Sequence, residues 1–171
     1  MVILVGDSRT KFEALIPRTE RDRCVFIYYG GGSYHILEGD MMPQVKKMLK
    51  KYPAAPVILN FGCNGNWESD NFGRLASVYD GLMAEYPERK FYVAAVYPSR
   101  SAEKYYTEDD MEKMNRRLKK KYGQDGLFID AASFIESSGF VSDEYMRDEL
   151  HYKNAANIAI LAWLRKQVGA D

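Results

Sequence analysis

Ser8 is the first residue of the chain whose type and position indicate catalytic chemistry. The sequence opens MVILVGDSRT, so an apolar run, Val2 to Val5, gives way almost at once to polar residues. Such a run is typical of a strand buried on both faces. A serine at its end can act as a nucleophile if a base lies nearby, although Gly, Asp and Ser are also ordinary turn residues.

Histidine is the usual base for a serine nucleophile, and the chain has two, His35 and His151. Asp148 precedes His151 by three residues, a spacing at which its carboxylate can reach Nδ1, fix the tautomer and stabilise the imidazolium. A surface histidine before a helix is the alternative. His35 has no carboxylate closer than Glu38, and we interpret it as a loop residue lining a cleft.

Small and polar residues also follow the second and third apolar runs. These stretches read YYGGGSYH, at residues 28–35, and NFGCNGNW, at residues 60–67. The carboxyl ends of parallel strands meet at one edge of a sheet, where the loops form a ligand crevice. We therefore expect Ser8 and both stretches to face one cavity, with ordinary turns as the alternative.

Five short apolar runs alternate with helical patterns along the chain. This order predicts an α/β fold, a three-layer α/β/α sandwich around a five-stranded parallel sheet, in one flavodoxin-like domain over residues 1–171. Thr107 and Asp110 have the capping-box spacing that marks a helix start. The expected strands are 2–6, 24–29, 56–61, 91–96 and 127–130, and the expected helices are about 41–52, 70–86, 107–121 and 153–168.

These motifs, in this order, resemble the blocks of the SGNH hydrolases, also called the GDSL esterases and lipases. The matching residues are GDSR after the first strand, a glycine-rich turn after the second, GCNG after the third and DELH before the last helix. The resemblance extends from Gly6 to His151. It implies the SGNH-hydrolase fold, with Ser8 as the nucleophile and with Asp148 and His151 completing a catalytic triad.

The resemblance also implies an oxyanion hole. In the family this site uses the amide of the serine, the amide of a glycine and the side chain of an asparagine, which here are Ser8, Gly32 and Asn64. Gly30 and Gly31 are alternatives to Gly32. We favour Gly32 because the chain must leave the strand before an amide can turn into the cleft.

Two positions depart from the family pattern. Gly65 stands where an aspartate is usual, so the support which that residue gives its loop is not expected here. Arg9 replaces the common leucine and is either a structural cation or one that faces the substrate. A G-x-S-x-G elbow is absent, which argues against an α/β-hydrolase.

Aromatic side chains near the predicted cleft bear on the substrate. Tyr34 and Trp67 are candidates for substrate binding, and Tyr97, Tyr105 and Tyr106 also flank the cleft in our interpretation. Aromatic rings pack against sugars and acyl chains alike, so they do not identify the substrate. The loops are short and no long apolar lid is visible, which favours a short acyl group, such as acetyl on a carbohydrate, over a long-chain lipid.

Composition excludes several partners. Lysine plus arginine and aspartate plus glutamate both number 24, so no net charge would attract nucleic acid. No apolar run approaches the roughly 20 residues of a membrane span, and no export signal precedes the first strand. We expect a cytoplasmic protein if the chain is full length, and an extracytoplasmic one if a signal peptide has been removed.

The two cysteines are expected to remain free. Cys24 begins the second strand and Cys63 follows the third, which would separate them by roughly 15 to 20 Å. A disulfide requires Cα atoms within about 7 Å. Neither cysteine has the spacing of a zinc ligand, and no cofactor is indicated.

We therefore predict a carboxylic ester hydrolase, a serine esterase that acts on a small acyl ester through an acyl-enzyme, without metal or cofactor. An O-acyltransferase with the same triad is one alternative, in which a sugar hydroxyl replaces water. The other is a non-catalytic flavodoxin-like domain that holds phosphate with GGGS. That segment lacks the spacing of the dinucleotide and P-loop fingerprints.

Overall fold

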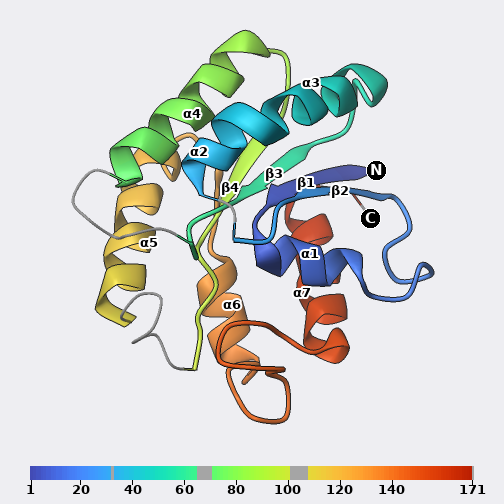
Figure 1. The fold of residues 1–171 in the computed structure, drawn as a ribbon, viewed down its shortest axis with the longest axis vertical. Coiled ribbons are helices and arrows are strands. Elements are labelled where there is room, and N and C mark those ends of the chain that lie inside the picture. The colour runs from blue at the N-terminus through green and yellow to red at the C-terminus, as the bar shows by residue number, and fades with distance from the viewer. Residues whose placement is uncertain (32, 65–70, 101–107, 171) are drawn as a thin grey trace.

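A sheet of five parallel strands forms the centre of the fold (Figure 1). The computed structural model describes residues 1–31, 33–64, 71–100 and 108–170. The strand order β2-β1-β3-β4-β5 confirms the predicted flavodoxin-like α/β architecture. The strands are β1 (Val2–Gly6), β2 (Cys24–Tyr28), β3 (Val57–Asn60), β4 (Phe91–Ala94) and β5 (Phe128–Ile129).

The central strands are apolar on both faces because helices cover both. Side chains alternate between the two faces of a strand, and in β1 they enter two separate cores. Ile3 and Val5 belong to the core beneath α3, α4 and α5, whereas Val2 and Leu4 belong to the core beneath α6 and α7. Figure 1 shows these helices on opposite sides of the sheet, with α1 on the side of α7. The helices are α1 (Ser8–Ala14), α2 (Tyr34–Ile36), the π-helix η1 (Leu37–Met41), α3 (Met42–Lys51), α4 (Asn71–Glu85), α5 (Glu108–Tyr122), α6 (Ala131–Ser137) and α7 (Asn154–Gln167).

The four long helices confirm the predicted ones, while the short elements α1, α2, η1 and α6 were not expected. Thr107, of the proposed capping box, lies outside the described residues. Four strands also end earlier than predicted, because the chain leaves the sheet there to build loops. The sequence pattern marks long amphipathic helices well, whereas short helices leave too few turns for a period to show.

The start of α1 explains the glycine of the first motif. Asp7 is the N-cap of α1, and its Oδ1 accepts a hydrogen bond of 3.0 Å from the amide of Arg9. A Cβ on Gly6 would lie 2.1 Å from Thr10 Oγ1 and 2.7 Å from the carbonyl oxygen of Asn60. Only glycine therefore allows the helix to begin directly after β1.

The sheet order places a topological switch point between β1 and β3. The chain leaves β1 through α1 to its neighbour β2 on one side, and leaves β3 through α4 to β4 on the other side. In open parallel sheets ligands bind at the carboxyl ends of the strands at this switch point. Ser8 follows β1 there, and Asn64 follows β3.

The structure also bears on disulfide bonds, membrane-spanning helices and metal sites. Cys24 and Cys63 are both free, the first at the start of β2 and the second beyond the end of β3. Within the described ranges, no helix combines the length and the apolar character needed to cross a membrane. The same ranges hold no group of three or more His, Cys, Asp and Glu side chains placed to bind a metal ion.

Candidate active site

Ser8 and His151 meet at the carboxyl edge of the sheet. His151 Nε2 lies 2.9 Å from Ser8 Oγ, although the two residues are 143 positions apart in the chain. Ser8 is the first residue of α1, and His151 lies in the loop that precedes α7. The structure therefore brings a hydroxyl and an imidazole within hydrogen-bond distance.

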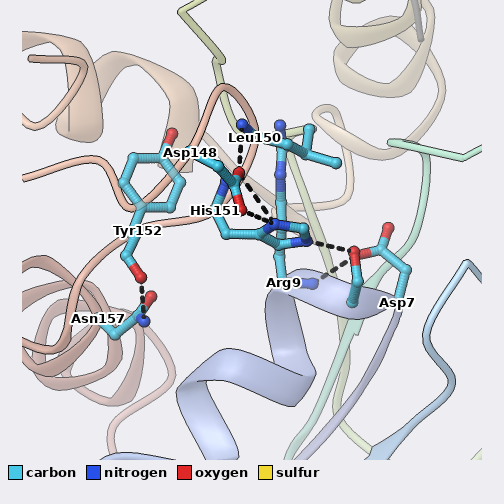
Figure 2. Close-up of polar contacts among 8 residues, drawn as sticks. Asp7, Arg9, Asp148, Leu150, His151, Tyr152 and Asn157 are labelled. Atoms are coloured by element: carbon cyan, nitrogen blue, oxygen red, sulfur yellow. Dashed lines mark hydrogen bonds and ion pairs between the residues drawn. The ribbon is translucent and has the colours of Figure 1, made fainter. Parts of the chain in front are cut away.

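Asp148 holds the other nitrogen of the same imidazole, as Figure 2 shows. His151 Nδ1 lies 3.0 Å from Asp148 Oδ1 and 2.9 Å from Oδ2. A carboxylate acceptor favours the tautomer with its proton on Nδ1, which leaves Nε2 as an acceptor for the Ser8 hydroxyl. The three side chains thus form one continuous hydrogen-bond network.

The charge of Asp148 is stabilised locally. The backbone amides of Leu150 and His151 each donate to Oδ1 at 2.8 Å. Partial burial acts to raise the pKa of Asp148, but the hydrogen bonds from the His151 side chain and these two amides outweigh it and lower the pKa below its usual value. The carboxylate is therefore ionised at neutral pH.

The loop that carries Asp148 and His151 is fixed at both ends. Met146 and Tyr152 form an antiparallel bridge across it, and the amide of Arg147 donates to the carbonyl of His151 at 2.7 Å.

Tyr152 connects this loop to the rest of the fold. The Tyr152 hydroxyl donates to the carbonyl of Pro98, beyond β4. The side chain of Asn157, on α7, donates to the carbonyl of Tyr152 at 3.0 Å (Figure 2). These bonds set the position of the imidazole relative to the sheet.

Phe12 is a neighbour of the imidazole that the sequence did not reveal. Its ring lies 4.4 Å from the His151 ring between centroids, and the Arg147 guanidinium lies 5.0 Å from the centroid of the Phe12 ring. Phe12 is four residues after Ser8, so on a helix both face the same side. Prediction of α1 would have been needed to find it.

Asp7 links the first motif to the third. Besides capping α1 through Oδ1, its carboxylate accepts from the amide of Cys63 through Oδ2 at 3.4 Å. Asp7 is almost fully buried, and a buried carboxylate is stable when such donors satisfy it. The bond holds the loop after β3 against the loop after β1.

The structure describes two of the three predicted oxyanion donors, Ser8 and Asn64. Ser8 occupies the first helical position, where backbone amides have no acceptor within the helix. Asn64 is half-buried, and its Nδ2 donates to Cys63 Sγ at 3.3 Å. Gly32, the preferred glycine, and Gly65 lie outside the described residues. Gly31 adopts φ +79°, a left-handed conformation that suits glycine.

Arg9 and Tyr97, two candidates for residues that face the cleft, are both buried. Arg9 is 3% exposed, and its guanidinium donates to the carbonyl of Tyr97 and lies 5.8 Å from the centre of that ring. Tyr97 is 1% exposed, and its hydroxyl donates to Glu13 at 3.1 Å. Arg9 therefore has the structural role that the sequence left open, and substrate contact by either residue is not supported. Both side chains are held in the interior by these bonds between α1 and the segment that follows β4.

Tyr34 and His35 line a pocket beside α4. Together with Glu38 and residues of α4 they enclose about 260 Å³, and their rings lie 3.8 Å apart between centroids. The Tyr34 hydroxyl accepts from Arg74 at 2.8 Å. His35 is exposed on α2 rather than in a loop. Among the other aromatic candidates, Trp67, Tyr105 and Tyr106 lie outside the described residues.

A parallel α/β/α sandwich with these side chains at its carboxyl edge has the fold of the SGNH hydrolases. No protein-family model matches the chain, and no curated protein matches it. Solved structures do, over nearly the full length and at low identity, so the resemblance is confirmed at the level of the fold.

Three of these structures illustrate the likeness. A GDSL-like lipase from Bacteroides thetaiotaomicron has a TM-score of 0.73 at 16% identity, with 98% of this chain and 86% of that chain covered. A lipase/acylhydrolase from Enterococcus faecalis has a TM-score of 0.71 at 15% identity, with coverages of 97% and 96%. An acetylxylan esterase from Geobacillus stearothermophilus has a TM-score of 0.70 at 15% identity, with coverages of 99% and 94%.

Proposed function

We propose that the chain is a serine esterase that hydrolyses a small acyl ester through an acyl-enzyme. The observation that carries the proposal is the hydrogen-bond network of Ser8, His151 and Asp148. His151 Nε2 lies 2.9 Å from Ser8 Oγ, and His151 Nδ1 lies 2.9 Å from Asp148 Oδ2. A nucleophile, a base and a group that orients the base are what acyl transfer by serine requires. A domain that only binds a ligand has no need of this alignment.

Acylation begins when Ser8 Oγ attacks the ester carbonyl carbon and its proton passes to His151 Nε2. The carbonyl π electrons move to oxygen, and Asp148 stabilises the imidazolium that forms. The amides of Ser8 and Gly32 and the side chain of Asn64 donate to the oxyanion. When the tetrahedral intermediate collapses, the ester C–O bond breaks, and the imidazolium proton goes to the leaving alcohol.

Deacylation repeats these steps with water. His151 accepts a proton from a water molecule as its oxygen attacks the acyl carbon of the Ser8 ester. The bond from the acyl carbon to Ser8 Oγ then breaks, the proton returns to Oγ, and the carboxylic acid leaves. In each half of the cycle His151 first accepts a proton and then donates it.

We assign a short acyl group, such as acetyl on a carbohydrate, as the substrate. The absence of a long apolar lid from the sequence supports a small acyl pocket. The likeness in fold to an acetylxylan esterase supports a carbohydrate as the alcohol. Rates on nitrophenyl acetate, butyrate and octanoate are expected to fall with acyl length, and release of acetate from acetylated xylan tests the alcohol.

A fluorophosphonate probe tests the nucleophile. Ser8 Oγ is expected to displace fluoride from phosphorus and retain the label, because it lies 2.9 Å from His151 Nε2, which can accept its proton. Peptide mass spectrometry locates the label. Ser8→Ala should abolish both labelling and esterase activity, whereas Ser77→Ala, at an exposed serine of α4, should keep both. Labelling at another serine, or none in folded protein, contradicts the mechanism.

A further inference from the structure

Cys63 occupies the turn that leads from β3 to Asn64. Gly62 adopts φ 136°, which lets the chain turn sharply after the strand. The amide of Cys63 then donates to Asp7, at 3.4 Å, and the side chain is 1% exposed. Cys63 is therefore held in place by the same carboxylate that caps the helix of Ser8.

The thiol of Cys63 is neutral at this position. Burial raises the pKa of Cys63 well above its usual value, and the negative charge of Asp7 raises it further. A neutral, buried thiol is a poor nucleophile, so Cys63 does not compete with Ser8 for the ester. The thiol also forms hydrogen bonds with the side chains of Asp7 and Ser8, and its sulfur atom can accept a further hydrogen bond.

Asn64 uses that acceptor. Its Nδ2 donates to Cys63 Sγ at 3.3 Å. A side-chain amide has two N–H bonds, and a bond made by one of them fixes the plane of the amide and the direction of the other. Sulfur is a weak acceptor, so it can orient the amide without holding it as tightly as an oxygen would.

We infer that Cys63 is a positioning residue, whose sulfur orients the Asn64 amide so that its second N–H points at the oxyanion. The inference rests on the proposed function, because it concerns the oxyanion donors of that reaction. Cys63 acts through Asn64 and does not touch the substrate. Its effect should therefore appear in kcat, where the oxyanion develops, and not in KM.

A matched pair of variants isolates the sulfur. Cys63→Ala and Cys63→Ser leave cavities of nearly the same size, but only serine keeps an acceptor. We expect Cys63→Ala to lower kcat by about tenfold with KM unchanged, and Cys63→Ser to stay within about threefold of the wild type. Equal kcat values in the two variants would overturn the inference. Melting temperatures of both variants report the cost of the cavity separately.

A double-mutant cycle tests whether Cys63 acts through Asn64. Asn64→Ala alone should lower kcat by roughly 10² to 10³, as loss of an oxyanion donor does. Adding Cys63→Ala to it should then cause no further loss. An undiminished tenfold loss in the double variant would overturn the inference. If the alanine variants do not fold, Cys63→Thr and Cys63→Val form a second pair, in which only threonine has a hydrogen-bond acceptor.

The same data separate this inference from the proposed function. A wild-type protein with no esterase activity and no labelling at Ser8 overturns the proposed function, and this inference with it. An active wild type in which Cys63 and Asn64 act independently overturns the role of Cys63 alone. Activity together with coupling in the cycle supports both.

Discussion

At the scale of single residues, the surroundings distinguish two histidines of the same chemical type. His151 lies between Ser8 and Asp148, with an acceptor on one ring nitrogen and a hydroxyl on the other. His35 is exposed on α2 and packs against the ring of Tyr34. Only His151 is therefore placed to take a proton from a nucleophile.

Substitution of each histidine checks this assignment. His151→Ala should lower kcat/KM by a factor of thousands or more, because removal of one member of a triad removes most of its action. His35→Ala should change kcat/KM only modestly. Steady-state rates on a nitrophenyl ester measure both, and equal losses would mean that the base has been assigned to the wrong residue.

At the scale of the element, α1 is unusual because its inner face is polar. Arg9, Thr10 and Glu13 are all buried, although a helix that packs on a sheet normally buries apolar residues there. Among the described residues, Glu13 Oε2 has no hydrogen-bond partner, while Oε1 accepts from Tyr97. The helix that begins with Ser8 therefore carries a buried carboxyl group on the side that faces the sheet.

Burial raises the pKa of Glu13 from its ordinary 4.5 to about 8. The hydrogen bond from Tyr97 and the charge of Arg9 act in the opposite direction, whereas the charge of Asp7 adds to the rise. Between these two pH values the folded protein keeps the proton, while the unfolded chain has lost it. The free energy of unfolding therefore falls as pH rises through this window, by up to about 1.4 kcal/mol per pH unit.

Glu13→Gln tests this linkage. The amide cannot ionise, so the stability of the variant relative to the wild type should rise between pH 4.5 and 8 and level off above. Urea unfolding at pH 5, 6.5 and 8 measures the difference. Glu20→Gln, at an exposed glutamate, is the control and should show no such trend. Parallel stability curves for wild type and Glu13→Gln would contradict the prediction.

At the scale of the whole molecule, the sheet separates the site from the groups that stabilise the fold. Leu4 lies in the central strand β1, is fully buried, and pairs with Phe26 on one side and Ile58 on the other. It stands several residues from the carboxyl edge where Ser8 follows. Stability and chemistry should therefore respond to different substitutions.

Two leucines provide the comparison. Leu4→Ala should lower the free energy of unfolding by about 2 to 5 kcal/mol, because it leaves a cavity in the core, and should lower Tm by roughly 5 to 15 °C. Leu15→Ala, at a leucine that is 56% exposed, should change stability by less than about 0.5 kcal/mol. In both variants kcat per folded molecule should remain near wild type. A loss of kcat in folded Leu4→Ala would show that the core also shapes the site.

The sequence by itself determined the sheet and the residues proposed for the triad. Continuous apolar runs can be read as strands because both faces of a parallel sheet are covered, and long helices show their period. Ser8, Asp148 and His151 could be predicted because the short motifs that contain them resemble those of the SGNH hydrolases, and because Asp148 and His151 are only three residues apart. The resemblance lies in local motifs and their order along the chain, so no tertiary contact is needed to find it.

Only the tertiary structure decided which side chains surround these residues. The sequence gives no period by which α1 could be recognised, since three of its four buried positions are polar. The contact of Phe12 with His151 and the burial of Arg9 were therefore hidden. The bond from the Cys63 amide to Asp7 joins segments 56 residues apart, and it holds the turn in which Asn64 contacts Cys63. Such contacts depend on how β1 and β3 lie side by side, and this pairing brings together the loops that follow the two strands although they are far apart in the chain.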